Sequence, residues 1–162
     1  MKKAEAPLSE EKSKDLSGSK IQDLTPLKIL LVDDSEDNRT VVEAFLKSTP
    51  FIVESVASGQ EALFKVKSPE SHYDVILMDL QMPILDGFEA TKLIRQWEKQ
   101  EKRIPMQIIA LSASSMPEDI KRALASGCNQ HLSKPIKKSL LIEKLKTVSN
   151  IRSVKPEDFG LG

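Results

Sequence analysis

The sequence predicts an α/β domain with a doubly wound, five-stranded parallel sheet and five helices. Two observations support this fold class. Five short apolar runs alternate with five amphipathic helical patterns, and such alternation is typical of α/β proteins. The runs are apolar at consecutive positions, as in Ile29, Leu30 and Leu31, which indicates strands covered by helices on both faces. Right-handed crossovers between such strands leave few possible topologies.

The first half of the pattern gives two strands and two helices. A strand is expected at 28–32, and Ser35 just beyond it can cap a helix that ends by Pro50. A second strand is expected at 51–56, followed by a second helix. The apolar residues of these two helices are Val41, Val42, Phe45 and Leu46, and then Ala62, Leu63 and Val66. Their spacing gives each helix one face for packing on the sheet.

The second half of the pattern gives three strands and three helices. The expected strands are 74–78, 107–111 and 130–132. Asp86 leads into a helix that must stop before Pro105. Pro117 suits the first turn of the next helix, and Gly127 suits its left-handed C-terminal cap. The third and fifth helices carry Phe88, Leu93, Ile94 and Trp97, and then Leu140, Leu141, Ile142 and Leu145.

Length and composition place one domain between two tails. A chain of 162 residues suits one compact domain, which we expect at 27–148. Residues 1–26 are rich in Lys, Glu, Ser and Asp, which predicts a disordered leader or linker because little apolar surface is available for burial. Ile21 and Leu24 could dock this leader near the domain. Residues 149–162 are expected to form a C-terminal tail.

The composition also excludes several classes of function. The 24 basic and 24 acidic side chains balance, so no strongly basic surface is expected for nucleic acid or membrane. The single cysteine, Cys128, rules out an internal disulfide and a cysteine-cluster metal site. No run approaches the roughly 20 apolar residues of a membrane span, and no signal peptide follows Met1. We therefore expect a cytoplasmic protein that binds neither nucleic acid nor membrane.

Polar side chains gather where the expected strands end. Asp33 and Asp34 follow the first strand, Asp79 the third, Ser112 the fourth and Lys134 the fifth. In doubly wound sheets, ligands bind beyond these carboxyl ends. Clustered carboxylates repel one another unless a cation lies among them, and Mg²⁺ is the commonest such ion near phosphate. Because a carboxylate can act as a nucleophile and a lysine can bind phosphate oxygen, the set predicts phosphoryl transfer.

Four segments resemble the signature segments of the bacterial response-regulator receiver family, in the family's order. They are ILLVDDSEDNR at 29–39, DVILMDLQMPILDG at 74–87, IIALSA at 108–113 and LSKPI at 132–136. The resemblance covers roughly residues 27–148 and implies the flavodoxin-like receiver fold with strand order 2-1-3-4-5. The residues around Asp79, MDLQMP at 78–83, also resemble those of receivers in hybrid histidine kinases. A phosphoacceptor switch is therefore expected, phosphorylated by a sensor histidine kinase or histidine phosphotransfer protein and acting on an unknown output partner.

The resemblance implies roles for the acidic residues and the lysine. Asp79 would be the phosphoacceptor, and Lys134 would pair with the phosphoryl group. Mg²⁺ would be bound directly by Asp34 and Asp79, and by Asp33 through a water molecule. The backbone carbonyl of Gln81 would supply another oxygen. Such a protein catalyses its own phosphorylation and slow dephosphorylation, so it is not expected to be an enzyme that acts on other substrates.

The resemblance also implies roles for residues that shape or switch the site. Ser112 would bond a phosphoryl oxygen and move on activation, and the small Ala113 would leave the entry path open. The peptide bond before Pro135 is expected to be cis, and Gly87 is expected to shape the loop after the acceptor. His131 stands where the family usually has Tyr or Phe. Two readings of it stay open, a switching ring and a partly buried strand residue.

Three other functions are disfavoured by the sequence. A phosphatase of the haloacid dehalogenase type would need an Asp two residues after its nucleophile, where this chain has Gln81. A pseudo-receiver that only binds a partner would not need the intact acceptor, hydroxyl and lysine. A DNA-binding regulator would need a basic helix-turn-helix, and too few residues follow the last expected helix.

Overall fold

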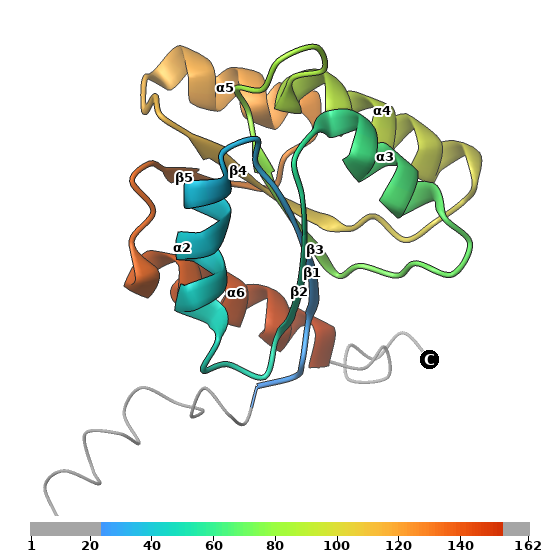
Figure 1. The fold of residues 1–162 in the computed structure, drawn as a ribbon. Coiled ribbons are helices and arrows are strands. Elements are labelled where there is room, and N and C mark those ends of the chain that lie inside the picture. The colour runs from blue at the N-terminus through green and yellow to red at the C-terminus, as the bar shows by residue number, and fades with distance from the viewer. Residues whose placement is uncertain (1–23, 154–162) are drawn as a thin grey trace, which may run out of the picture.

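The computed structural model describes residues 24–153, which form a parallel sheet with helices on both faces (Figure 1). Most of the leader and tail expected from the sequence lies outside these residues. The strands are β1 (Lys28–Val32), β2 (Ile52–Val56), β3 (Val75–Asp79), β4 (Gln107–Ser112) and β5 (Gln130–Ser133). The helices are α2 (Glu36–Leu46), α3 (Gly59–Lys67), α4 (Gly87–Gln100), α5 (Pro117–Ser126) and α6 (Lys138–Ser153). Within 24–153, no helix is long and apolar enough to span a membrane.

The strand order β2-β1-β3-β4-β5 confirms the predicted topology. All four pairings are parallel, and Asp79 lies opposite Leu111 while Ser112 lies opposite Ser133. The observed β3 and β4 each run one residue further than the expected 74–78 and 107–111, because the ladder continues to Asp79 and Ser112. Both of these residues are therefore held by strand pairing and not by a loop.

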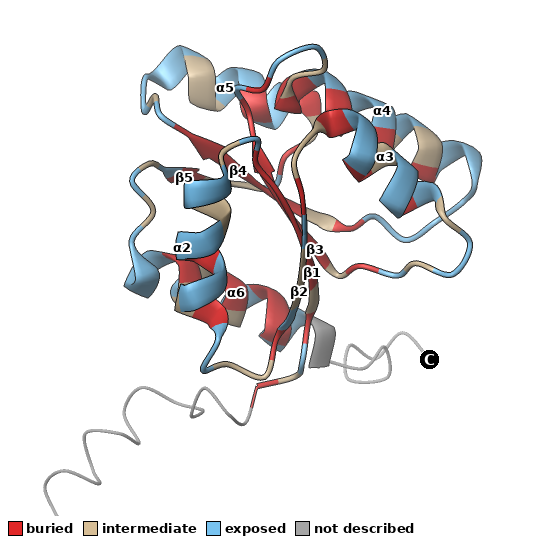
Figure 2. Cartoon of the chain, viewed as in Figure 1, coloured by how far each residue is buried: buried red, intermediate tan, exposed pale blue. Residues whose placement is uncertain are grey.

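Alternate strand residues enter two separate cores, one on each face of the sheet. Buried residues lie along the central strands and on the helices that cover them (Figure 2). On β1, Leu30 packs toward α3, α4 and α5, whereas Ile29 packs toward α2 and α6. This alternation follows from the two-residue period of a strand. The edge strand β2 departs from the fully apolar pattern, since Ile52 is 59% exposed. The central strands β1, β3 and β4 are each paired on both sides, and they carry most of the site.

Local capping positions the helices that flank the site. The Ser35 hydroxyl accepts a hydrogen bond from the Asn38 amide, and the Asp86 carboxylate accepts one from the Glu89 amide. These contacts satisfy free N–H groups at the starts of α2 and α4. Gly127 ends α5 at φ 116°, a left-handed conformation that glycine adopts without steric penalty.

Arg95 connects α4 to Met106, which precedes β4, and to Gly127, which follows α5. Its guanidinium donates to the carbonyls of Gly127 and Met106 at 2.9 and 2.8 Å. It also donates to Asn129 Oδ1 at 2.7 Å and to Glu98 Oε1 at 2.8 Å. Glu98 is only 2% exposed, so this buried carboxylate is neutralised by the arginine at its side, as buried charges generally require.

The packed unit reaches beyond 27–148 at both ends. Leu24 is buried in the core beneath α6. The Ser149 hydroxyl donates to the Thr25 carbonyl at 2.9 Å, and α6 continues to Ser153. Thr25, before the expected start of the domain, and Ser149, after its expected end, therefore hold each other in place near the start of β1.

Candidate functional site

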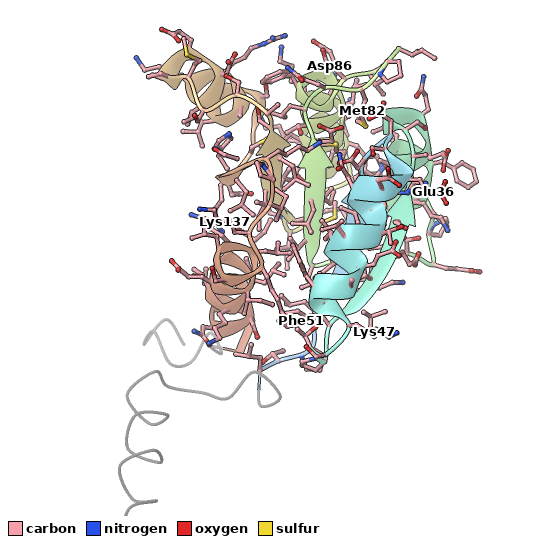
Figure 3. All side chains as sticks on the ribbon, turned by 60° about the vertical axis from the view of Figure 1, so that its left-hand side comes forward. Glu36, Lys47, Phe51, Met82, Asp86 and Lys137 are labelled. Carbon is pink, nitrogen blue, oxygen red and sulfur yellow. The ribbon has the colours of Figure 1, made fainter. Side chains whose placement is uncertain are left out.

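The polar residues expected at the strand ends lie on one edge of the sheet. Asp33 and Asp34 follow β1, Asp79 ends β3, Ser112 ends β4 and Lys134 follows β5. Figure 3 shows the labelled Met82 and Asp86, which belong to the loop after β3, at the opposite end of the domain from Phe51 and Lys47. The parallel arrangement of the strands thus collects residues from distant parts of the sequence.

Three carboxylates form a compact cluster at this edge. Asp33, Asp34 and Asp79 each offer one oxygen, and these oxygens all lie within 4.8 Å of one another. Asp33 and Asp79 are buried, at 1% and 3% exposed, whereas Asp34 is exposed. Oxygen ligands of this kind suit a hard divalent cation. The donor set therefore fits a metal ion that enters from the solvent side, where Asp34 lies.

Asp33 is oriented by a set of donors on both of its oxygens. Its Oδ1 accepts from the Ser35 amide at 2.9 Å, and its Oδ2 accepts from Asn38 Nδ2 at 3.3 Å and from Lys134 Nζ at 3.0 Å. Arg39 Nη1 donates to the Asp33 carbonyl at 2.7 Å. These contacts fix the carboxylate at the end of β1.

Asp79 lies between the neighbouring Asp33 carboxylate and the Lys134 ammonium. Its Oδ1 is 3.1 Å from Lys134 Nζ and accepts from the Gln81 amide at 3.2 Å. Burial, followed by repulsion from Asp33, raises the pKa of Asp79 to about 6, although Lys134 and the Gln81 amide act in the opposite direction. Without a cation, burial raises the pKa of Asp79 more than Lys134 lowers it. The charged carboxylate present at neutral pH is therefore in an unfavourable environment.

Lys134 places one ammonium between two of the carboxylates. Burial lowers its pKa, but the hydrogen bond to Asp33 and the attraction of Asp79 outweigh burial, and the net pKa is raised. The Lys134 amide donates to the Ser112 carbonyl at 2.7 Å, which anchors the residue beside β4. The peptide bond between Lys134 and Pro135 is cis. The ammonium is therefore charged and fixed between the Asp33 and Asp79 carboxylates.

Ser112 is buried at the end of β4, and its hydroxyl accepts a hydrogen bond from the Ser114 amide at 3.0 Å. The Ser114 hydroxyl in turn donates to Asp119 of α5 and accepts from the Met116 amide at 3.3 Å. Ala113 between them is exposed. The β4–α5 loop is thus held by hydroxyl and amide contacts that begin at Ser112. Beside it lies a cavity of about 430 Å³, whose lining includes Ser112, Ser114 and Asp119.

The loop after β3 turns back tightly on the end of that strand. Gly87 donates its amide to the Leu80 carbonyl at 3.0 Å. A Cβ at Gly87 would lie 2.2 Å from the Asp79 carbonyl oxygen, so only glycine fits. Ile84 in the same loop has φ 70° and is 94% exposed, a strained backbone state for a β-branched residue.

His131 pairs with Ala110 in the sheet, and its Nε2 atom is buried without a hydrogen-bond partner. Among the buried side-chain nitrogen and oxygen atoms of residues 24–153, it alone lacks a partner. This position is consistent with either reading left open by the sequence, a partly buried strand residue or a ring that changes position.

Three contributors to the site received no role from the sequence. Asn38 and Arg39 hold Asp33, and Asp119 holds the β4–α5 loop through Ser114. Asn38 and Arg39 fall inside the 29–39 segment that resembles the family, so their spacing from Asp33 on the first turns of a helix was an available signal. Asp119 looks like an ordinary first-turn acidic residue of α5 and gave no such signal.

Comparison with known proteins identifies the family. The family model of the response regulator receiver domain matches residues 29–146. Hybrid signal transduction histidine kinase G of Dictyostelium discoideum is 41% identical over 123 residues, a match that covers 75% of this chain and 4% of that kinase. The chain spans between 4% and 7% of the length of six such Dictyostelium kinases that it matches.

Solved structures agree with this assignment. One is the co-crystal structure of the Saccharomyces cerevisiae histidine phosphotransfer protein Ypd1 with the receiver domain of Ssk1, with a TM-score of 0.74, 34% identity, and coverage of 82% of this chain and 95% of that chain. Another is the receiver domain of the Pseudomonas aeruginosa sensor histidine kinase PA1611, with magnesium coordinated in its active site cleft. Its TM-score is 0.67 at 37% identity, over 78% of this chain and 99% of that chain. The chain therefore belongs to the response regulator receiver domain family, the phosphoacceptor modules of two-component signalling.

Proposed function

We propose that Asp79 is the phosphoacceptor of this domain and that a phosphohistidine on a kinase or phosphotransfer protein is the donor. The observation that carries the proposal is the contact of Asp79 with Lys134 at 3.1 Å inside the acidic cluster. A carboxylate is a competent nucleophile for phosphorus. The Ssk1 receiver, which crystallises with the phosphotransfer protein Ypd1, supports a donor of this class.

The proposed transfer is a direct exchange of the phosphoryl group. A carboxylate oxygen of Asp79 forms a bond to phosphorus while the bond between phosphorus and the histidine nitrogen breaks. The imidazole leaves with the electron pair of that bond and takes up a proton. Lys134 binds a phosphoryl oxygen, and the Ser112 hydroxyl donates to another. Positioning and charge neutralisation supply most of the catalysis in such transfers. Attack by water on the acyl phosphate later releases inorganic phosphate and returns the free carboxylate, so we expect the domain to modify itself and to act on no other substrate.

The acidic cluster is proposed to hold Mg²⁺. Asp34 and Asp79 would be direct ligands, Asp33 would act through water, and the Gln81 carbonyl would add an oxygen. The chemistry of the three carboxylates fits this ion, and the PA1611 receiver binds magnesium in its active site cleft. When bound, the ion would neutralise charge on the phosphoryl oxygens.

The remaining assignments are proposed from the same geometry. Ala113, exposed beside the site, would leave room for the donor. Ser112 would move toward the phosphoryl group, and His131 would follow it. The parts of the expected leader or linker (1–26) and of the expected C-terminal tail (149–162) that lie outside residues 24–153 would flank the receiver domain without taking part in its chemistry. The output would pass to a protein partner in the cytoplasm, without contact to nucleic acid or membrane.

The test is phosphorylation of the purified chain by acetyl phosphate and by a phosphorylated histidine phosphotransfer protein, with Mg²⁺ present. We expect labelling of the wild type, and none for Asp79→Ala or after EDTA is added. Asp86→Ala is the matched control, because Asp86 is an acidic residue at the same edge that caps α4. Normal labelling of Asp79→Ala, with the phosphate mapped to another residue, would refute the assignment.

A further inference from the structure

A second cavity lies at the opposite edge of the sheet from Asp79. It encloses about 270 Å³ between α3, the segment that enters β3, and the segment that joins α4 to β4. It shares no lining residue with the cavity beside Ser112. None of the residues placed at the proposed phosphoacceptor site lines this cavity.

One side of this cavity is apolar and partly aromatic. Tyr73 and Met106 are buried in the main core and form part of its wall, together with Val66. Trp97 of α4 also contributes its indole ring and is only partly buried. Ile104 is 80% exposed at the same cavity. The surface therefore suits a hydrocarbon or aromatic group.

The polar side of the cavity carries two cationic side chains, Lys102 and Arg103, and its lining contains no Asp or Glu. His72 also lines it, with its Nε2 atom 3.7 Å from the Asp74 carboxylate outside the lining. The guanidinium of Arg103 lies over the Trp97 ring at 4.9 Å from its centroid, and the Arg103 amide donates to the Glu98 carbonyl at 2.8 Å. The arginine is thereby fixed against the aromatic wall. A guanidinium stacked in this way keeps its N–H edge available to an anion.

We propose that this cavity binds a small amphipathic organic anion, a ring or short hydrocarbon that carries one carboxylate or sulfonate. The apolar wall would take the hydrocarbon, and Arg103 and Lys102 would take the anionic group. A cavity of this volume is slightly smaller than the roughly 300–1,000 Å³ of pockets for drug-sized ligands, so one or two rings would fill it. Inorganic phosphate would leave the apolar wall bare, which excludes it as the preferred ligand.

The chain offers a direct optical test because Trp97 is its single tryptophan. The probe is anilinonaphthalene sulfonate, a fluorescent aromatic anion, and its neutral counterpart N-phenylnaphthylamine is the comparison. With the full chain, we expect energy transfer from Trp97 to the bound sulfonate and weaker binding of the neutral dye. Arg103→Gln and Lys102→Gln should each lower affinity for the sulfonate about tenfold, the loss expected for one charge-assisted hydrogen bond. Trp97→Phe should keep binding under direct dye excitation but abolish the energy transfer.

Arg122→Gln is the matched control, because the Arg122 guanidinium also lies over a ring, that of Phe88, but lines the cavity beside Ser112. Its affinity for the sulfonate should equal that of the wild type. The inference is overturned if the neutral dye binds as tightly as the sulfonate, if Arg122→Gln weakens binding while Arg103→Gln does not, or if no energy transfer occurs. Labelling of Asp79 is measured on the same variants, so failure of the cavity proposal and failure of the phosphoacceptor proposal are read separately.

Discussion

Lys134 Nζ lies 3.1 Å from Asp79 Oδ1, across two strand ends that are distant in the sequence. The same ammonium is 3.0 Å from Asp33 Oδ2. One positive charge therefore faces two buried carboxylates, and the pocket keeps a net negative charge that a divalent cation would balance.

Lys134→Ala should slow phosphorylation of Asp79 far more than it weakens Mg²⁺ binding. The ammonium is proposed to face the phosphoryl oxygens, and removal of one such charge typically slows a reaction by about 100-fold or more. The measurements are the labelling rate with acetyl phosphate and a Mg²⁺ titration followed by stability. Lys137→Ala, an exposed lysine three positions along, is the control. Loss of Mg²⁺ binding with an unchanged labelling rate would contradict this layout.

Asp79→Asn should remove a pH dependence of stability from the metal-free protein. Burial and Asp33 raise the folded-state pKa of Asp79 from 3.8 to about 6, so between these values the folded state binds more protons than the unfolded state. The free energy of unfolding of the wild type therefore falls as pH rises through this window, by up to about 3 kcal/mol. Urea denaturation in EDTA at about pH 4.5 and pH 7 measures it. Parallel pH profiles for the two proteins would show that Asp79 does not destabilise the fold.

Mg²⁺ should stabilise the wild type more than it stabilises Asp34→Asn. A ligand that binds only the folded state adds about 2.7 kcal/mol to the free energy of unfolding at 100 times its dissociation constant. Thermal unfolding with Mg²⁺ and with EDTA measures the difference. Asp37→Asn removes a nearby exposed charge that is not part of the cluster, and it should respond like the wild type. Equal stabilisation of all three proteins by Mg²⁺ would show that Asp34 is not a ligand of the metal.

Gly87→Ala should destabilise the fold by about 2–3 kcal/mol or more. The new Cβ would lie 2.2 Å from the Asp79 carbonyl oxygen and 2.7 Å from the Leu80 Cα, and overpacking against backbone forces the strand end to move. Gly59→Ala should have a smaller effect, because its new Cβ would meet the Leu85 loop at 2.8 Å. Chemical denaturation of both variants gives the comparison. An unchanged denaturation midpoint for Gly87→Ala would mean that the loop accommodates the added methyl group without loss of stability.

His131→Phe should stabilise the protein by about 1 kcal/mol. The buried Nε2 atom has no hydrogen-bond partner, and a buried polar atom without one is destabilising by roughly 1–3 kcal/mol. Phenylalanine keeps a ring and removes the atom. Chemical denaturation provides the test, with His72→Phe at a largely exposed histidine as the control. A less stable His131→Phe protein would indicate that water satisfies Nε2.

The sequence was sufficient for the sheet and for the position of the site because both depend on local patterns. The apolar runs predicted the strands, and the polar residues directly after them predicted which side chains share one edge. The resemblance supplied the strand order, which the structure confirms. The ends of β3, β4 and β5 were each placed one residue too early, since strand pairing and not composition decides where a ladder stops.

The contacts of Arg95 could not have been predicted. In the sequence it is a charged residue on an amphipathic helix, a position that usually faces solvent. In the structure its partners are Glu98 on its own helix and residues of two other segments, Met106 before β4 and Gly127 and Asn129 between α5 and β5. Such a contact depends on how α4 is oriented relative to β4 and β5, which no single segment encodes. The same holds for Ser149 and Thr25, whose contact joins the two ends of the described chain.

The two ends of α5 are bonded to different parts of the domain. The C-terminal end, at Gly127, is bonded to a guanidinium that also binds a buried carboxylate. The N-terminal end is connected to Ser112 through the hydroxyl and amide groups of the β4–α5 loop. The two ends of α5 therefore answer to different neighbours: a change at Ser112 would reach α5 at its N-terminal end, through Ser114 and Asp119, whereas Gly127 at the other end is bonded to α4.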